Sequence, residues 1–416
     1  MNMKLEDELE NSGFSIGWVL RKLNGYCDDY LLRKGSKQVV NIEARDVADG
    51  KGYLSSVFIT TVTFDDKSKF TFAIKVPTFE RVFKIIEDME GTTEDSKEGL
   101  KDKVKAAHNI ECDAIAFVSS CKDFPSPKVY YVEKSGQDME CGLQDKVSPG
   151  VIIMSALDGI SLGGYVTVTK EQCLNFARDF ATLHDFVATV PYNVWGGKFD
   201  NRIHWDPLMF ENAKACLNIF VEEYPDVANI CAKLKTVNWP KYVDYALHER
   251  PAELHAKTYV HGDVWANNIM YKKNSDGSVG DEVLAYIDYQ CGFEGNPMFD
   301  FARFFSINAD AEVRREVYKA ALKVYYERLT ELYAQRGAKV PYDLEAVEEM
   351  YELAFMQQST QSASMVLSLN KEHNGDMADG VAEARSAKAL LRVHFILLDA
   401  EKIWQKRNFD DLPIFD

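Results

Sequence analysis

Two patterns of hydrophobic and polar residues follow one another along this chain, first alternating and then helical. Between residues 39 and 76, three stretches alternate apolar and polar residues and are separated by Asp-Gly and Asp-Asp turns. A period of two is typical of half-buried strands, so these stretches are predicted to form an antiparallel meander. Two later apolar stretches are predicted to complete a five-stranded lobe. The predicted strands are residues 39–47, 53–64, 69–76, 128–133 and 150–156.

Helical spacing of apolar residues is found before the first strand, between the third and fourth strands, and through most of the chain after residue 156. The predicted helices are residues 16–23, 79–89, 104–118, 170–187, 311–336, 344–369 and 381–406. With 416 residues, the chain is long for a single hydrophobic core. We therefore predict an α+β protein with an antiparallel β lobe at residues 1–155 and a mainly helical lobe at residues 156–416.

Oxygen-bearing side chains gather in the stretch 257–293. His261-Gly262-Asp263 is followed at a short spacing by Asn268, and two β-prone runs come after it. If these runs form an antiparallel hairpin in which Ile269 pairs with Ile287, Asn268 lies beside Asp288 at its open end. Three such side chains suit a hard cation with phosphate ligands, as Mg²⁺ is usually held. The arrangement also matches the template of phosphoryl transfer, with a loop Asp, an Asn and a second Asp.

The residues HGDVWANN (261–268) and IDYQ (287–290) resemble small-molecule kinases of the protein-kinase-like superfamily. The resemblance is greatest to the ecdysteroid-kinase-like (CHK kinase-like) group, with choline kinases and aminoglycoside phosphotransferases as wider relatives. It implies a bilobal protein-kinase-like fold and transfer of the γ-phosphoryl group of ATP to a small-molecule hydroxyl. It further implies that Asp263 orients or deprotonates that hydroxyl, and that Asn268 and Asp288 ligate Mg²⁺.

The predicted β lobe contains the matching nucleotide-binding segments. Glycines in the first hairpin let backbone N–H groups approach phosphate oxygens. Lys75 lies in Phe72–Val76, which resembles the Val-Ala-Ile-Lys of kinases, where the ammonium pairs with nucleotide phosphates. A helix Glu should fix this lysine; Glu111 is the preferred candidate, and Glu87 and a surface Glu without a partner are the alternatives. The cofactor-binding candidates are Gly50, Gly52, Tyr53, Ser55, Lys75, Glu111 and, for adenine through main-chain groups, Met154 and Ser155.

Three competing interpretations remain. Gly159-Ile160-Ser161-Leu162-Gly163 matches the nucleophile elbow of serine hydrolases, but the elbow needs a helix directly after Ser161, and a Gly-rich, β-branched stretch follows. A protein kinase is disfavoured because Gly262, not Arg, precedes Asp263 and no Asp-Phe-Gly segment is present. A pseudokinase-like binding protein stays open, because intact residues do not prove turnover.

The composition of the chain disfavours some classes of binding partner. The chain has 48 basic and 65 acidic residues, a net charge of −17, which argues against binding nucleic acid or an anionic membrane. Its eight cysteines form no Cys-x-x-Cys pair, and no apolar run has the length of a signal core or a membrane span. A reducing, cytoplasmic location is expected. The acceptor, expected to be a steroid alcohol, amino alcohol or glycoside, and the oligomeric state are not specified by the sequence.

Overall fold

The computed structural model describes residues 4–47, 54–78, 94–136, 148–199, 206–373, 379–412 and 414. The chain divides into two compact units. The first, here called the sheet unit, comprises Met1–Ser120 and Ser126–Asp158; the second, the helical unit, comprises Cys121–Pro125 and Gly159–Asp416. The predicted α+β class is confirmed, with antiparallel β-structure in the N-terminal part and mainly helices in the C-terminal part.

The sheet unit contains a five-stranded antiparallel sheet in the order β1-β2-β3-β5-β4 within the described residues. Each strand is paired antiparallel with its neighbours, and β3 lies in the centre between β2 and β5. The elements are α1 (Ile16–Tyr26), α2 (Asp28–Lys34), β1 (Val39–Asp46), β2 (Ser55–Phe64), β3 (Lys69–Pro77), α4 (Glu94–Val118), β4 (Val129–Glu133) and β5 (Val151–Ser155).

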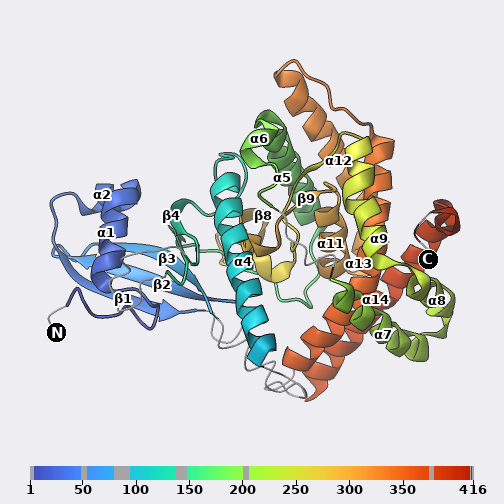
Figure 1. Cartoon of the computed structure of the whole chain (residues 1–416), viewed down its shortest axis with the longest axis horizontal. Coiled ribbons are helices and arrows are strands. Elements are labelled where there is room, and N and C mark those ends of the chain that lie inside the picture. Colours follow the sequence, from blue (N-terminus) through green and yellow to red (C-terminus); the bar gives the residue numbers. More distant parts are fainter. Residues whose placement is uncertain are drawn as a thin grey trace. The chain divides into compact units, whose positions relative to one another are not determined.

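One face of this sheet is covered by α1. Alternate residues of β2 are buried, including Phe58 and Val62, as expected for a strand with one face in the core. Trp18 and Leu23 of α1 belong to the same hydrophobic cluster, and Figure 1 shows α1 lying across the strands. By contrast, β3 is buried continuously from Phe72 onward. A charged side chain on the second half of β3 is therefore held away from water.

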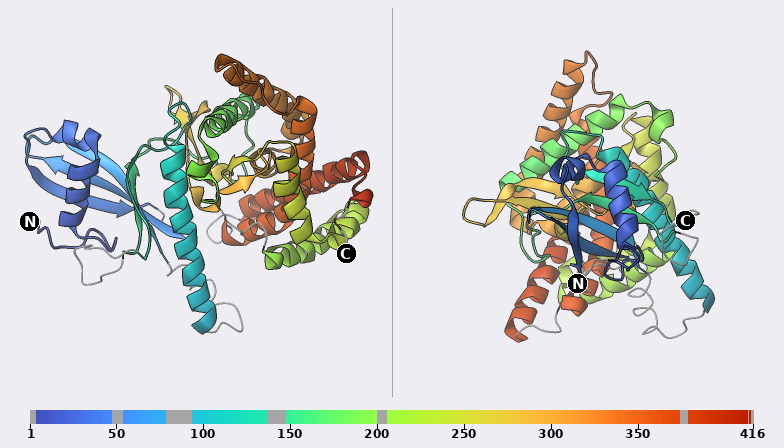
Figure 2. Two further views of the ribbon diagram at one scale, coloured as in Figure 1. Left: turned by 45° about the horizontal axis from the view of Figure 1, so that its top comes forward. Right: turned by 90° about the vertical axis from the view of Figure 1, so that its left-hand side faces the viewer.

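Among its described residues, the helical unit contains two short two-stranded sheets, one of which is a hairpin that extends away from the helices (Figure 2). Its helices are α5 (Lys170–Thr189), α6 (Tyr192–Trp195), α7 (Pro207–Glu223), α8 (Ala228–Thr236), α9 (Trp239–Asp244), η3 (Tyr245–Glu249), α10 (Arg250–Glu253), α11 (Phe299–Asn308), α12 (Ala311–Gln335), α13 (Leu344–His373) and α14 (Asp379–Lys406). Its strands are β6 (Thr258–Val260), β7 (Ile269–Lys273), β8 (Val279–Tyr286) and β9 (Phe293–Gly295). Single 3₁₀ turns are η2 (Pro225–Val227), η4 (Ala266–Asn268), η5 (Tyr289–Cys291) and η6 (Phe409–Asp411).

Buried aromatic side chains join α5, α11 and β8. Phe176 of α5 stacks on Phe304 of α11 with ring centroids 4.1 Å apart. Phe124 contacts both Phe180 and Tyr286. This packing explains why the segment 121–125 belongs to the helical unit, although the sequence pattern placed it in the β lobe.

Helices α5 and α12 start where the sequence predicts, but α4 begins at Glu94, ten residues before the predicted start at residue 104. The helix predicted at residues 79–89 lies outside the described residues. Thr169 caps α5 through a capping box with Gln172, which satisfies N–H groups of the first turn. All ten residues of α11 are buried, so its polar residues need partners inside the protein. No helix in the described ranges is long and apolar enough to cross a bilayer.

Candidate active site

The buried charge on β3 is Lys75, and it forms an ion pair with α4. Lys75 Nζ lies 2.6 Å from Glu111 Oε1, and the two residues are 5% and 2% exposed. The main chain holds Lys75 between Val57 of β2 and Ile152 of β5. Of the two expected glutamates, Glu111 is the one that contacts Lys75; Glu87 lies outside the described residues. What Lys75 binds besides Glu111 stays a prediction.

The other predicted nucleotide-binding residues of the sheet unit have different outcomes. Gly50, Gly52 and Tyr53 lie outside the described residues. Ser55 begins β2 and pairs with Pro77. The remaining two, Met154 and Ser155, end β5.

At this end of β5, Ser155 is hydrogen-bonded to Lys128, the residue that precedes β4. Ser155 N–H donates to Lys128 O at 2.8 Å, and Ser155 Oγ accepts from Lys128 N–H at 3.0 Å. Met154 pairs with Ala73 and is 8% exposed. A role of Met154 and Ser155 in binding adenine stays a prediction.

In the helical unit, strand β6 leads into the loop that contains Asp263. Gly262 has a φ of +83°, and a Cβ there would overlap the carbonyl oxygen of Cys291, so only glycine fits. The carboxylate of Asp300 accepts the N–H groups of His261 at 2.8 Å and of Gly262 at 2.9 Å. Burial raises the pKa of Asp300 to about 7, while these two N–H donors act in the opposite direction. Asp300 thus supports the loop.

His261 ties this loop to the end of β8. Its Nε2 lies 3.1 Å from Ile287 O, and its Nδ1 accepts the N–H of Asp263 at 3.3 Å. Because one ring nitrogen accepts and the other faces a carbonyl oxygen, these contacts require the neutral Nε2–H tautomer. Burial lowers the pKa of His261, against the effect of the Asp263 and Asp288 carboxylates. The histidine is therefore structural rather than a base.

Both oxygens of the Asp263 carboxylate are held by side chains. Asn268 Nδ2 donates to Oδ2 at 3.0 Å and to the main-chain oxygen of Asp263 at 2.9 Å. Arg303 Nη2 donates to Oδ1 at 2.7 Å. The Asp263 side chain is 17% exposed, so the carboxylate is fixed in orientation and still reachable. A carboxylate held in this way can orient a hydroxyl group.

The hairpin that positions Asn268 and Asp288 has a different register from the one predicted. Ile269 pairs with Tyr286, not with Ile287, because the pairing shifts twice along β7 and β8 supplies additional residues. The prediction assumed a hairpin without bulges. Ile287 N–H nevertheless donates to Asn268 O at 3.0 Å, so Asp288 directly follows a residue bonded to Asn268.

Asp288 has a left-handed backbone with φ +68° and ψ +68°. This conformation costs a non-glycine residue about 1–2 kcal/mol and is found preferentially at functional sites. Gln290 Nε2 donates to Asp288 Oδ2 at 3.3 Å. Asn268 and Asp288 together offer amide and carboxylate oxygens, which are the ligands that Mg²⁺ prefers. In the described ranges, no group of three or more His, Cys, Asp or Glu residues is arranged to hold a metal ion.

Sequence reasoning missed Arg303. It lies one helical turn after Asp300 on α11, so the two side chains share a face and reach the same loop. The signal was present in the sequence, since Arg303 is the one basic residue in the apolar stretch FDFARFFSI (299–307). An arginine in such a stretch must find a buried partner.

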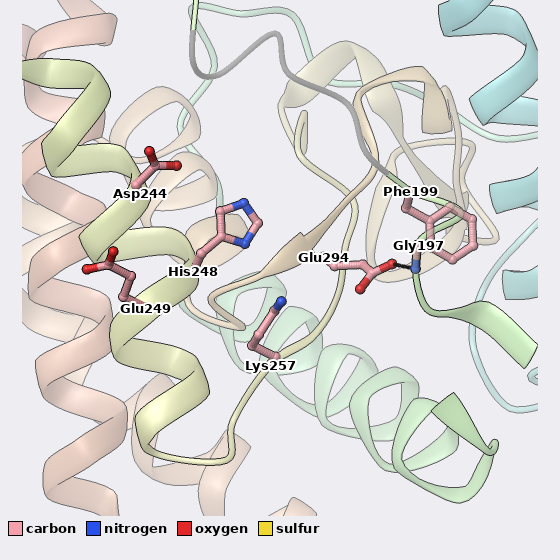
Figure 3. Close-up of a pocket in the computed structure, with 7 residues that line it drawn as sticks. All are labelled: Gly197, Phe199, Asp244, His248, Glu249, Lys257 and Glu294. Carbon is pink, nitrogen blue, oxygen red and sulfur yellow. Dashed lines mark hydrogen bonds between the residues drawn. The ribbon is translucent and has the colours of Figure 1, made fainter. Parts of the chain in front are cut away.

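A separate pocket of about 440 Å³ lies in the helical unit (Figure 3). Asp244, His248 and Glu249 line one side of it, Lys257 lies below, and Glu294 lies opposite. Glu294 already accepts hydrogen bonds from the Gly197 N–H and the Tyr192 hydroxyl. None of the residues predicted to bind nucleotide or metal lines this pocket.

The comparison with protein families identifies the class. A family model, DUF1679, described as "Uncharacterized oxidoreductase dhs-27", matches residues 32–193 and 245–408. The chain therefore belongs to the DUF1679 family, which is an ecdysteroid-kinase-like family. The kinase-like recognition from the residues at 261–268 and 287–290 is confirmed at this level.

The relatives are distant. The chain is 20% identical over 353 residues to a Caenorhabditis elegans protein called "Uncharacterized oxidoreductase dhs-27", covering 83% of this chain and 41% of that protein. The chain thus spans about two-fifths of the length of this curated relative.

Solved structures with some likeness include two kinases. One is a choline kinase from Cryptosporidium parvum Iowa II, with 13% identity, 94% of this chain and 96% of that chain covered, and a TM-score of 0.48. Another is a Plasmodium vivax ethanolamine kinase, with 12% identity, 97% and 99% covered, and a TM-score of 0.43.

Proposed function

We propose that this protein transfers the γ-phosphoryl group of ATP to a hydroxyl group of a small metabolite. The observation that carries the proposal is the Asp263 carboxylate, which Asn268 holds on one oxygen and Arg303 on the other. Asp288 directly follows Ile287, whose N–H donates a hydrogen bond to the main-chain oxygen of Asn268. This set of side chains supports the phosphoryl-transfer template, in which positioning and electrostatics supply the rate.

Asp263 would receive the acceptor hydroxyl. A carboxylate has about four lone-pair positions, and Asn268 and Arg303 occupy two of them. The remaining positions can accept a hydrogen bond from the hydroxyl group of the substrate. This hydrogen bond directs a lone pair of the hydroxyl oxygen at phosphorus. As the O–P bond forms and the bond to the leaving oxygen of ADP breaks, the hydroxyl proton passes to Asp263. His261, held neutral, keeps the loop in place.

Asn268 and Asp288 would hold Mg²⁺ through the amide and carboxylate oxygens. When bound, Mg²⁺ neutralises negative charge on the phosphates of the nucleotide. In the sheet unit, the Lys75 ammonium would bind nucleotide phosphate while Glu111 holds it in place. Gly50, Gly52, Tyr53 and Ser55 would cover the phosphates, and Met154 and Ser155 would contact adenine through main-chain groups.

The acceptor is proposed to be a steroid alcohol, an amino alcohol or a glycoside. Binding of nucleic acid or membrane is not proposed, since the net charge is −17. A cytoplasmic location is proposed as well. It is supported by the seven described cysteines, which all carry free thiols.

The oxidoreductase named in the comparisons is a different activity, and we do not propose it for this chain. The matched relative extends well beyond the aligned part, because this chain covers 41% of the length of that protein. The sequence also lacks the Gly-x-Gly-x-x-Gly fingerprint that positions a dinucleotide on a helix N-terminus. The serine hydrolase interpretation is wrong, because no helix follows Ser161 until Lys170 begins α5.

The test is a screen for transfer over a metabolite extract. The protein is incubated with ATP and Mg²⁺, and products are detected by a mass increase of about 80 Da, one HPO₃ unit. Wild type is compared with Asp263→Asn, which is expected to lower the rate by about 10³-fold. Asp276→Asn is the matched control, because Asp276 lies in the turn of the β7–β8 hairpin and bonds only to Ser278 among the contacts found.

Three results separate the interpretations. Transfer by wild type and Asp276→Asn but not by Asp263→Asn supports the kinase. ATP binding without transfer to any acceptor, equal in all three proteins, supports a pseudokinase-like binding protein. Transfer that survives Asp263→Asn undiminished would contradict the assigned role of Asp263.

A further inference from the structure

Arg303 links the Asp263 carboxylate to a buried polar stretch of α13. Its Nη2 donates to Asp263 Oδ1 at 2.7 Å, and its Nη1 donates to Gln358 Oε1 at 3.2 Å. Gln358 Nε2 in turn donates to Gln361 Oε1 at 3.2 Å. Arg303 is 8% exposed, and both glutamines are buried. The guanidinium is thus clamped at one end by α13 and holds the candidate base at the other.

Stability alone does not account for this arginine. Burying an ion costs several kcal/mol before pairing, and replacing a buried pair with apolar residues is often neutral or stabilising. The arrangement around Arg303 is also incomplete, because its Nε–H is buried and has no hydrogen-bond partner among the described residues. The neighbouring positions of α11 are filled by Phe301, Ala302 and Phe304. A methionine would suit this environment better if packing were the only requirement.

We propose that Arg303 is a positioning residue for phosphoryl transfer, fixing the orientation and the negative charge of the Asp263 carboxylate. This inference rests on the proposed function. Asn268 alone leaves Oδ1 of Asp263 unrestrained, so the carboxylate could rotate about its Cβ–Cγ bond. A second donor on Oδ1 removes that rotation, and a charge-assisted bond at 2.7 Å does so strongly. The planar guanidinium, itself held by Gln358, transmits the rigidity of α13 to the loop.

The role predicts a pattern of kinetic effects that a packing role does not. Because Arg303 acts through Asp263, Arg303→Met is expected to lower kcat by about 10²-fold and to leave the KM for ATP within about twofold. Arg303→Lys keeps the positive charge but loses the planar, forked set of guanidinium donors. Its kcat should therefore be about tenfold higher than that of Arg303→Met and still about tenfold below that of wild type. In an Asp263→Asn background, adding Arg303→Met should lower residual single-turnover transfer by less than about twofold.

The matched control is Arg314→Met. Arg314 is a second buried arginine of the helical unit, paired with Asp399 at 2.9 Å on a different helix pair. Its loss is expected to lower the melting temperature and to leave kcat unchanged. If Arg303→Met does not fold, the variants Gln358→Met and Arg303→Lys test whether Arg303 positions the Asp263 carboxylate. Loss of the Gln358 clamp should lower kcat by about threefold to tenfold, again without a change in KM for ATP.

Several outcomes would overturn the inference. Unchanged kcat in Arg303→Met shows that Arg303 is structural only, as does an equal loss of kcat in Arg314→Met. A full further loss in the Asp263→Asn background shows that Arg303 acts independently of Asp263. If the foldable variants Gln358→Met and Arg303→Lys both match wild type, positioning is likewise excluded. Wild type that transfers to no acceptor overturns the proposed function and this inference together, which distinguishes that failure from the others.

Discussion

The two units hold their key charged residues in different ways. In the sheet unit, Lys75 forms a buried ion pair with Glu111, which joins the central strand β3 to α4. In the helical unit, Asp263 is fixed through two donors on its carboxylate and through a loop that is bonded to Asp300 and to the end of β8. The first arrangement joins a strand to a helix through a buried ion pair, and the second joins a loop to several elements.

This difference follows from what each site rests on. A strand in the middle of a sheet is already positioned by its neighbours, so the backbone that carries Lys75 is held by β2 and β5. A loop has no neighbouring strands to pair with, so its main-chain N–H groups need hydrogen-bond acceptors from other parts of the protein. Asp300 and His261 are those supports, and Gly262 permits the turn. Because Lys75 and Glu111 are both buried, we expect loss of the Glu111 carboxylate to be the most costly of these changes.

The largest effect is expected for Glu111→Ala. It leaves the Lys75 ammonium buried without this counter-ion, which should cost about 3–5 kcal/mol of stability of the sheet unit. The double variant Lys75→Met, Glu111→Leu removes both charges and should regain most of that loss. Hydrogen exchange of the β3 amides measures the loss of stability in the single variant and its recovery in the double variant. A cost below about 1 kcal/mol for the single variant would mean that the pair is solvated in solution.

Asp300→Ala should have the next largest effect. The N–H groups of His261 and Gly262 lose a charged acceptor, and bonds of this kind contribute about 1.5–3 kcal/mol each. We expect a total of about 3 kcal/mol, because water can replace part of the loss. Denaturant unfolding gives the value. Asp206→Ala, which removes the side-chain N-cap of α7, should cost about 1 kcal/mol and serves as the comparison.

Gly262→Ala tests whether the loop geometry itself is required. Gly277 has the same φ of +83°, but a Cβ there meets nothing, whereas a Cβ on Gly262 would overlap Cys291. Both substitutions carry the left-handed penalty of about 1–2 kcal/mol, and Gly262→Ala must also displace the backbone beside Asp263. Thermal unfolding should rank Gly262→Ala as the more costly. Transfer activity should fall only for Gly262→Ala, and equal effects would contradict the close contact.

The smallest effect concerns pH and compares a histidine from each unit. Burial lowers the pKa of His108 to about 4, and His108 Nε2 lies 3.1 Å from Glu133 O. Because the folded pKa lies below the unfolded value of 6.5, the unfolded chain binds the proton first, and stability is lost as pH falls below 6.5. Between pH 6.5 and about 5.5 the loss should be about 1 kcal/mol.

His261 has the same sign of shift, so acidification should weaken the Asp263 loop as well. Unfolding curves of wild type, His108→Gln and His261→Gln at several pH values isolate each contribution. Each variant should show a weaker loss on acidification than wild type. A variant that retains the full wild-type slope would show that its histidine is already solvated.

The sequence by itself determined the two-part α+β class, the five strands of the sheet and the residues that carry the kinase-like resemblance. It did so because strand and helix periods, turn residues and the spacing from His261 to Asn268 are local properties of the chain. The choice of Glu111 was favoured by its neighbours in the sequence, but only the contact with Lys75 across the fold decided it.

Tertiary structure alone decided the rest. The register of the β7–β8 hairpin depends on bulges, and local alternation does not show where a strand takes up an extra residue. The segment 121–125 joined the helical unit because Phe124 packs on Phe180 and Tyr286. Arg303 and Asp263 are forty positions apart in sequence. They meet only because α11 packs beneath the loop, and no local pattern encodes a contact between residues so distant.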